Sequence, residues 1–342
     1  MNTELVIPEQ LQQAFPTMME GLRKAASIFD QIKSFEDIER VFLKGQGLSP
    51  NTYRSYLTAV KQFYSFTDGL NPLQVRPGDI EGYYDHLVSN VDRSTAYLRI
   101  RGLKKFFAGV RNIIPFYTSP FEIMNKKLVQ KLSQTKKGNR QQAALTATEV
   151  QAVLSWLKLD TTPKGLCNYV MFYTLVTSGL RASELLQLTW KDIELREDGY
   201  YALFIGKGDK TAEQELYAPA VEACREYFKM VNNHEPKLTD FLFLTVAQFN
   251  GDQPRPMTYA TMWARFKDIG INAREQGILT RDMVFSPHLC RRTYATNLYK
   301  SGMKIKAIQN KTRHASIETL TNHYIIDNEP AQDYIDDFIK IA

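Results

Sequence analysis

The sequence predicts a mainly α-helical protein of two domains, with one small antiparallel β-sheet in the second domain. Three observations lead to this prediction. Apolar residues recur at helical spacing through the first 110 residues, and a basic, polar stretch follows at residues 126–146. An aromatic and apolar run at residues 200–205 then precedes a glycine-containing turn, which is typical of a β-hairpin. A chain of 342 residues is long enough for two domains that each bury a core.

Three stretches of the first half predict amphipathic helices, at residues 50–67, 77–87 and 94–110. Their other faces carry basic side chains. The candidates for DNA contact are Arg54, Lys61, Arg99, Lys104 and Lys105. A basic helix face is either simply solvated or a surface for DNA phosphates, and several such faces in one domain favour DNA.

The stretch at residues 126–146 predicts an exposed, flexible linker, because it has almost no large apolar residue after Leu132. Its Lys136, Lys137 and Arg140 are further candidates for DNA contact. We therefore expect a helical DNA-binding domain at residues 1–137, including an N-terminal extension of open role. The second domain is expected at residues 138–342.

The second domain is predicted to be mixed. A helix begins after the capping residue Thr146, and the run 200–205, the turn 206–210 and a short run at 215–217 predict a hairpin. Further helices are expected at residues 166–177, 180–188, 219–231, 258–275, 287–300, 303–311 and 316–326. A last amphipathic segment spans residues 333–341.

The composition narrows the class of protein. Hydrophobic residues make up 44% and charged residues 23%, which is typical of a globular protein. The net charge of +6 is compatible with a polyanionic partner. No apolar run is long enough to span a bilayer, the first residues do not resemble a secretory signal, and three separated cysteines indicate reduced thiols. We expect a cytoplasmic, nucleoid-associated protein with no membrane contact.

Two short motifs point to chemistry on phosphate. In TSGLRASELL, the turn at Gly179 delivers Arg181 to the start of a helix, and an arginine can hold two phosphate oxygens at once. In SPHLCRR, Ser286 caps a helix that carries His288 and Arg291 on one face, where the helix N-terminus attracts an anion. The alternatives are a surface Arg–Glu pair in the first motif and a surface His and Arg in the second.

Four segments in this order resemble the catalytic motifs of the tyrosine recombinase (phage integrase) family. They are TSGLRASELLQLTWKDI, GKGDK, SPHLCRRTYAT and RHASIETLTNHY, and together they span the second half. The first half, from SPNTYRSYLTAVKQFYSF onward, is similar to the helical core-binding domain of that family. The resemblance implies a DNA clamp made of a core-binding domain and a mixed α/β catalytic domain.

The resemblance also implies roles for particular residues. The two family arginines match Arg181 and Arg291, the hairpin lysine matches Lys207, the two histidines match His288 and His314, and the nucleophile matches Tyr324. The implied reaction breaks and rejoins DNA at a recombination site through a 3′-phosphotyrosyl intermediate and a Holliday junction, with neither a metal nor another cofactor. Without the resemblance, Tyr324 would read as a core aromatic, since it shares helical spacing with Ile317 and Leu320.

Two departures from the family pattern concern arginines. Arg292 follows Arg291 where the family often has His, and Thr312 and Arg313 replace the Leu-Gly pair that usually precedes the second histidine. Arg313 is expected either to alter the turn that presents His314 or to contact DNA.

Three readings of the function stay open at this point. A site-specific recombinase would work as a homotetramer on synapsed double-stranded DNA, with the C-terminal segment exchanged between protomers. The alternative for this segment is that it packs on its own domain. A type IB-like topoisomerase shares the chemistry but relaxes supercoils. A catalytically inactive DNA-binding regulator should have lost at least one of the six groups. The target sequence, and the choice between integrase and dimer resolvase, are not readable from one sequence.

Overall fold

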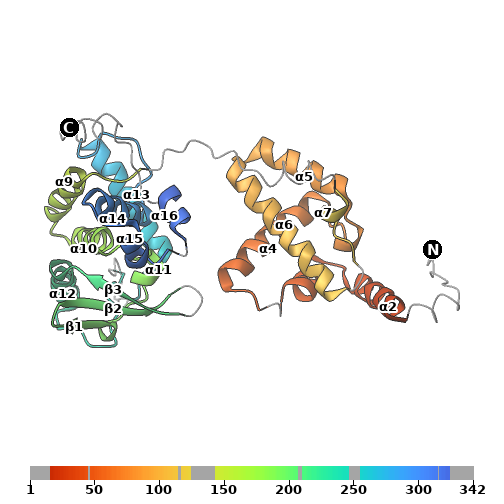
Figure 1. Cartoon of the computed structure of the whole chain (residues 1–342), viewed down its shortest axis with the longest axis horizontal. Coiled ribbons are helices and arrows are strands. Elements are labelled where there is room, and N and C mark those ends of the chain that lie inside the picture. Colours follow the sequence, from red (N-terminus) through yellow and green to blue (C-terminus); the bar gives the residue numbers. More distant parts are fainter. Residues whose placement is uncertain are drawn as a thin grey trace, which may run out of the picture. The chain divides into compact units, whose positions relative to one another are not determined.

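The computed structural model describes residues 16–44, 47–114, 117–124, 143–206, 210–245, 255–314 and 316–323. The chain divides into two compact units, Met1–Arg140 and Gln141–Ala342, and each is considered by itself (Figure 1). The boundary expected at residues 137–138 lies outside the described residues. Along the described ranges, no helix has both the length and the apolar character needed to cross a membrane.

The first unit is helical throughout its described part, as predicted. Its elements are α2 (Pro16–Gln31), α3 (Phe35–Ile38), the π-helical turn η1 (Glu39–Leu43), α4 (Pro50–Phe66), the 3-10 turn η2 (Pro72–Gln74), α5 (Pro77–Asn90), α6 (Arg93–Ile113) and α7 (Pro120–Ile123). The three amphipathic helices predicted from periodicity are α4, α5 and α6. Their apolar faces meet in one core that includes Phe42, Phe63 and Phe107.

Local chemistry sets the ends and the packing of these helices. The Ser49 hydroxyl accepts a hydrogen bond from the Thr52 N–H and Pro50 takes the first helical position, so α4 begins there. Helices α4 and α6 approach closely at Gly102, where a β-carbon would lie 2.8 Å from the β-carbon of Ala59. Glycine is therefore required at this crossing.

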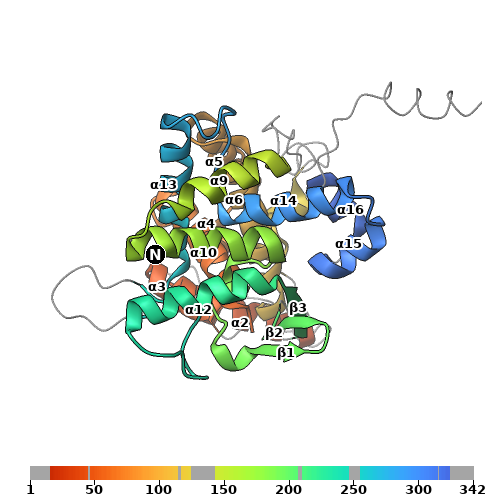
Figure 2. The same cartoon turned by 90° about the vertical axis from the view of Figure 1, so that its left-hand side faces the viewer.

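The second unit surrounds α10, which is buried along most of its length. Its helices are α9 (Ala147–Lys158), α10 (Pro163–Ser178), α11 (Ala182–Leu185), η3 (Trp190–Asp192), α12 (Ala218–Asn232), α13 (Tyr259–Glu275), α14 (Pro287–Lys300), α15 (Ile305–Thr312) and α16 (Ile317–His323). Helices α9, α12 and α14 all pack on α10 (Figure 2). The cysteines Cys167, Cys224 and Cys290 are buried and unpaired, as the sequence predicts.

The sheet has three antiparallel strands in the order β1 (Ile193–Arg196), β2 (Gly199–Ile205) and β3 (Thr211–Leu216). The predicted hairpin is β2–β3, in register with Ala202 opposite Gln214. Strand β1 was not predicted, because the alternation of apolar and polar residues in IELR covers only four residues and is too short to mark a strand by itself.

The helix predicted over residues 180–188 is shorter than expected. It ends at Leu185, and the Leu188 carbonyl accepts a hydrogen bond from the Leu242 N–H at 3.0 Å instead of from a helical neighbour. A backbone pairing between distant segments has replaced the last helical turn. Such pairing is invisible to local periodicity.

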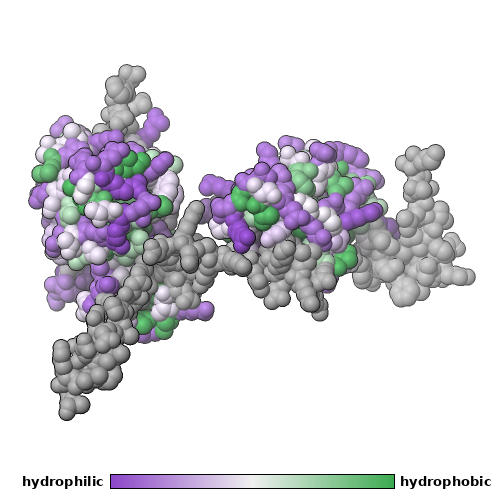
Figure 3. All heavy atoms as spheres, turned by 90° about the horizontal axis from the view of Figure 1, so that it is seen from above, coloured by the Kyte–Doolittle hydropathy of each residue, from purple (hydrophilic) through white to green (hydrophobic). Residues whose placement is uncertain are grey.

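The described surface of both units is mostly hydrophilic, with scattered apolar side chains (Figure 3). Exposed apolar residues of this kind are normal on a globular protein.

Candidate active site

The turn after α10 places Arg181. Helix α10 ends at Ser178, and Gly179 caps it in the left-handed conformation, with φ of 64°. A β-carbon at Gly179 would lie 2.3 Å from a ring carbon of Tyr294 on α14, so this turn is pressed against α14. Only glycine satisfies both the backbone and the contact. The chain then leaves the turn with Arg181 as the N-cap of α11.

Glu184 holds Arg181. One oxygen of the carboxylate accepts from the Arg181 Nη1 at 2.6 Å and the other from the Arg181 backbone N–H at 2.8 Å. The Glu184 side chain is 6% exposed, whereas that of Arg181 is 33% exposed. Burial alone would raise the pKa of Glu184, but the Arg181 N–H and the guanidinium groups of Arg313 and Arg181 lower it. Glu184 is thus a buried anion that keeps the more exposed Arg181 in place.

Helix α14 carries His288 and Arg291 on one face. Ser286 caps the helix by accepting from the Leu289 N–H, and Pro287 takes the first helical position. Arg291 is fully buried, with Nη1 donating to the Gly179 carbonyl and Nη2 donating to the Thr312 carbonyl. It therefore joins the turn after α10 to the end of α15. A phosphate can reach its guanidinium only if the surrounding turns move.

His314 follows α15 and is also buried. Its Nδ1 lies 2.6 Å from the Thr312 hydroxyl, which itself donates to the Ile308 carbonyl at 2.7 Å. A hydroxyl has one proton, so here it accepts from Nδ1–H, and this bond assigns the tautomer of the neutral ring. The remaining nitrogen, Nε2, is then the basic one.

The two histidines share a strongly cationic environment. Burial lowers the pKa of His314 to about 3, with further contributions from Arg291, Arg181, His288 and Arg313. Burial also lowers the pKa of His288 to about 4, together with Arg292, Arg291 and Arg181. The His288 side chain still reaches solvent, so water screens part of these effects; the direction of the shift leaves a neutral ring at pH 7.

These interactions bring four of the predicted residues into one region of the second unit. They are Arg181, His288, Arg291 and His314, which come from three separate segments of the sequence. Lys207 and Tyr324 lie outside the described residues, as does the segment 333–341. By sequence, Lys207 comes two residues after β2 and Tyr324 directly follows α16.

The structure shows the contacts of Arg292 and Arg313, the two arginines that depart from the family pattern. Arg292 donates from Nη1 to the Ala143 carbonyl at 3.0 Å, at the start of the second unit's described residues. Arg313 takes the left-handed conformation, with φ of 53°, and turns its side chain inward. Sequence reasoning missed Thr312 as the partner of His314, and also Gln214 as a partner of Arg313. No local pattern marks either contact.

The basic residues of the first unit differ in exposure. Arg54, Lys61, Lys104 and Lys105 are exposed, whereas Arg99 is half-buried and its charge acts on the Tyr83 hydroxyl. These DNA contacts stay predictions. Lys136, Lys137 and Arg140 lie outside the described residues.

Comparisons with known proteins give consistent results. Residues 127–330 match the model of the phage integrase family, and residues 36–113 match that of the phage integrase N-terminal SAM-like domain. The chain is 27% identical to tyrosine recombinase XerD of Listeria monocytogenes serotype 4b (strain F2365) over 295 residues, covering 83% of this chain and 91% of the relative. It is also 27% identical to tyrosine recombinase XerC of Staphylococcus haemolyticus (strain JCSC1435) over 303 residues, covering 86% and 94%.

Solved structures share the fold. The XerH site-specific recombinase bound to palindromic difH substrate, a post-cleavage complex, has a TM-score of 0.64 at 20% identity, covering 88% of this chain and 82% of that one. The Tn1549 transposon integrase in complex with circular intermediate DNA has a TM-score of 0.65 at 19% identity, covering 88% and 97%.

Proposed function

The chain belongs to the phage integrase family and is a site-specific DNA recombinase of the tyrosine type, and from this premise we propose that Tyr324 is its nucleophile. The observation that carries the proposal is the convergence of Arg181, Arg291, His288 and His314. A cluster of cations around two neutral histidines suits a phosphodiester, whose transition state concentrates negative charge on its non-bridging oxygens.

The proposed step forms one bond and breaks another. The Tyr324 oxygen attacks phosphorus, the bond from phosphorus to the 5′ oxygen breaks, and the product is a 3′-phosphotyrosyl enzyme with a free 5′-hydroxyl. Arg181 and Arg291 stabilise the non-bridging oxygens, and His314 joins them once the bound anion raises its pKa and Nε2 carries a proton. His288 accepts the phenol proton, for which its lowered pKa keeps the ring neutral, and Lys207 donates a proton to the leaving oxygen. Reversal of these steps on a partner strand leads through a Holliday junction to exchange.

The burial of Arg291 adds a requirement to this mechanism. Because Arg291 is fully buried and its Nη atoms donate to the Gly179 and Thr312 carbonyls, the turns that carry these carbonyls would have to shift before a phosphate could reach its guanidinium. Arg181 is partly exposed and can meet the phosphate without such a change. We propose that Arg181 makes the first contact.

For the assembly we propose a homotetramer on two synapsed duplexes, with the segment at residues 333–341 exchanged between protomers. The phosphates of the DNA backbone would be bound by basic residues of the segment 1–140, among them Lys104 and Lys105. A protein that works on such DNA sites would act in the cytoplasm, at the nucleoid.

A nicked suicide duplex made from DNA flanking the native locus tests the chemistry. The protein should form a covalent adduct that survives denaturation, and Tyr324→Phe should abolish it. The control is Tyr259→Phe, because Tyr259 is an exposed tyrosine of the second unit. The adduct should form equally well in the presence of a metal chelator. If Tyr324→Phe still formed the adduct, Tyr324 would not be the nucleophile.

A further inference from the structure

Arg313 occupies a backbone position that favours glycine. It caps α15 in the left-handed conformation, with φ of 53°, which costs a residue with a β-carbon about 1–2 kcal/mol. Its side chain is nevertheless only 17% exposed. The contacts of this side chain must therefore offset the backbone cost.

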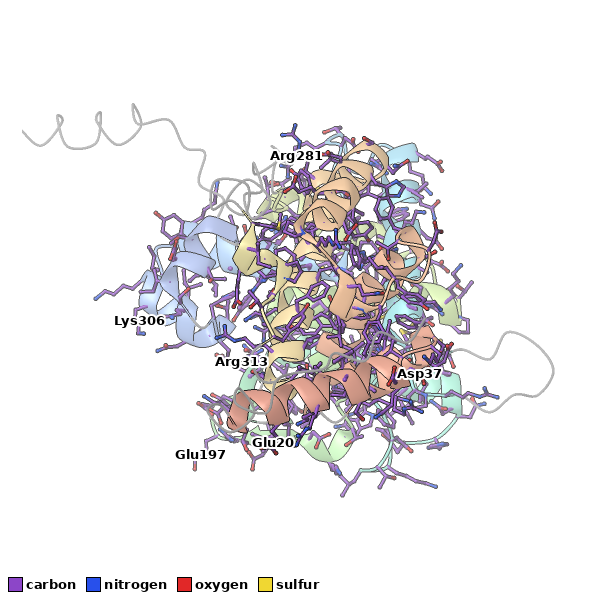
Figure 4. All side chains as sticks on the ribbon, turned by 90° about the vertical axis from the view of Figure 1, so that its right-hand side faces the viewer. Glu20, Asp37, Glu197, Arg281, Lys306 and Arg313 are labelled. Atoms are coloured by element: carbon purple, nitrogen blue, oxygen red, sulfur yellow. The ribbon has the colours of Figure 1, made fainter. Side chains whose placement is uncertain are left out.

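These contacts reach three other elements. Nη2 donates to the Glu184 Oε2 on α11 at 2.8 Å, and Nη1 donates to the Gln214 Oε1 on β3. The guanidinium carbon lies 4.9 Å from the ring centroid of Phe204 on β2. Gln214 and Phe204 are both buried on the inner face of the hairpin. Arg313, labelled in Figure 4, thus joins the end of α15 to α11 and to the β2–β3 hairpin.

Glu184 is shared between two arginines. Its Oε1 accepts from the Arg181 Nη1, while its Oε2 accepts from the Arg181 backbone N–H and from Arg313. With the second oxygen held by Arg313, the carboxylate has one orientation in which to hold Arg181. Arg313 also changes the net charge of this group. The charges of Arg181 and Glu184 cancel, and the charge of Arg313 makes the group net positive.

We propose that Arg313 is a positioning residue of the active site, which locks Glu184 onto Arg181, ties both to the hairpin, and keeps this group of charges net positive. The proposal rests on the proposed cleavage function. It replaces the expectation that Arg313 contacts DNA, because the guanidinium is directed at Glu184, Gln214 and Phe204.

The variant Arg313→Gly tests this role, since glycine suits the backbone and the chain should still fold. On the nicked suicide duplex, adduct formation at saturating DNA should fall roughly 10- to 100-fold, as expected for a displaced phosphate clamp. The dissociation constant for DNA should change less than about threefold, because no DNA contact is lost. Arg313→Lys should recover only part of the rate, since an ammonium lacks the planar fork that serves two acceptors.

Asn233→Gly is the matched control. Asn233 is another left-handed helix cap, with φ of 56°, at the end of α12. This change should leave both the cleavage rate and the DNA affinity as in the parent protein. A wild-type rate in Arg313→Gly would overturn the proposal. A weaker affinity with an unchanged rate at saturation would also overturn it, and would identify a DNA contact instead.

A double-mutant cycle separates this proposal from the proposed function. Arg313→Gly and Glu184→Gln should shift the midpoint of urea unfolding by less together than the sum of their separate shifts, because both remove the same ion pair. This holds whether or not the parent protein forms an adduct. Additive shifts would show that Arg313 does not act through Glu184.

Discussion

At the scale of single residues, the candidate site combines the buried Arg291 and His314, which are held by hydrogen bonds, with the more exposed Arg181 and His288. Arg291 donates to two backbone carbonyls, and the Thr312 hydroxyl connects His314 to the Ile308 carbonyl. Each bond holds a functional group in one orientation, and each is expensive to break, because a buried donor left alone costs about 1–3 kcal/mol. The neighbours of the catalytic candidates therefore determine how the functional groups are oriented.

The variant Thr312→Val removes the acceptor for the His314 ring. Valine has nearly the same shape as threonine, so the expected loss of about 1–3 kcal/mol in the free energy of unfolding reflects mainly the missing hydroxyl. The rate of adduct formation should fall as well, because His314 loses its orientation. Urea unfolding and the suicide-duplex assay measure the two effects. The partly exposed Thr321→Val on α16 is the control, and equal losses in both variants would contradict the prediction.

The histidine pKa values predict how stability depends on pH. Because the folded-state pKa of His288 is about 4 and that of His314 is about 3, the unfolded chain binds more protons than the folded chain below the ordinary value of about 6.5. Stability should therefore fall as the pH is lowered from about 7 toward 4. Urea midpoints at several pH values measure the slope.

His314→Gln should flatten this slope, because it removes one of the two groups. His234→Gln, at an exposed position just after α12, should keep it. An unchanged slope in His314→Gln would show that its ring titrates alike in the folded and unfolded chain.

At the scale of elements, the site depends on how turns meet helix α14. Gly179 packs against the ring of Tyr294 on α14. The Gly179 carbonyl also accepts a hydrogen bond from Arg291, which lies three residues before Tyr294 on α14. Both contacts join the end of α10 to α14. The sharp turn is thus a packing feature that also delivers Arg181.

Gly179→Ala should lower the free energy of unfolding by about 2–4 kcal/mol. Left-handed backbone costs about 1–2 kcal/mol for alanine, and the clash with the Tyr294 ring adds a similar amount. Gly277→Ala is the control for the backbone alone, since Gly277 has φ of 70° but no atom within 4 Å of the added β-carbon. Urea unfolding of both variants gives the comparison; equal losses would contradict the packing argument.

At the scale of the whole molecule, two units with separate cores divide the work of a recombinase. The positive net charge of the chain comes from the first unit, because residues 1–140 hold 20 Lys and Arg against 13 Asp and Glu, whereas residues 141–342 hold 23 against 24. Exposed lysines on α6 lie away from the core of the first unit. Contacts of such lysines with phosphate would add affinity without reading the sequence.

Replacing both Lys104 and Lys105 with Gln should weaken DNA binding to a similar extent on specific and unrelated duplexes. The slope of log affinity against log salt should fall by about 1–2, since each lost phosphate contact accounts for about 0.9. Titrations over a range of salt concentrations measure it. The control replaces two exposed lysines of the second unit, Lys158 and Lys237. An equal change in the control would show only an effect of net charge.

The sequence by itself determined the fold class, most helices, the hairpin and the family, because helical periodicity, capping residues and ordered motifs are local signals. It also marked Arg181, His288, Arg291 and His314. Only the tertiary structure decided that Leu188 pairs with Leu242 and ends a predicted helix, that Arg291 is enclosed, and that Arg313 turns inward to Glu184 and Gln214. Each of these facts is a contact between residues distant in the sequence, and the energy of a buried polar group depends on partners that no local pattern specifies.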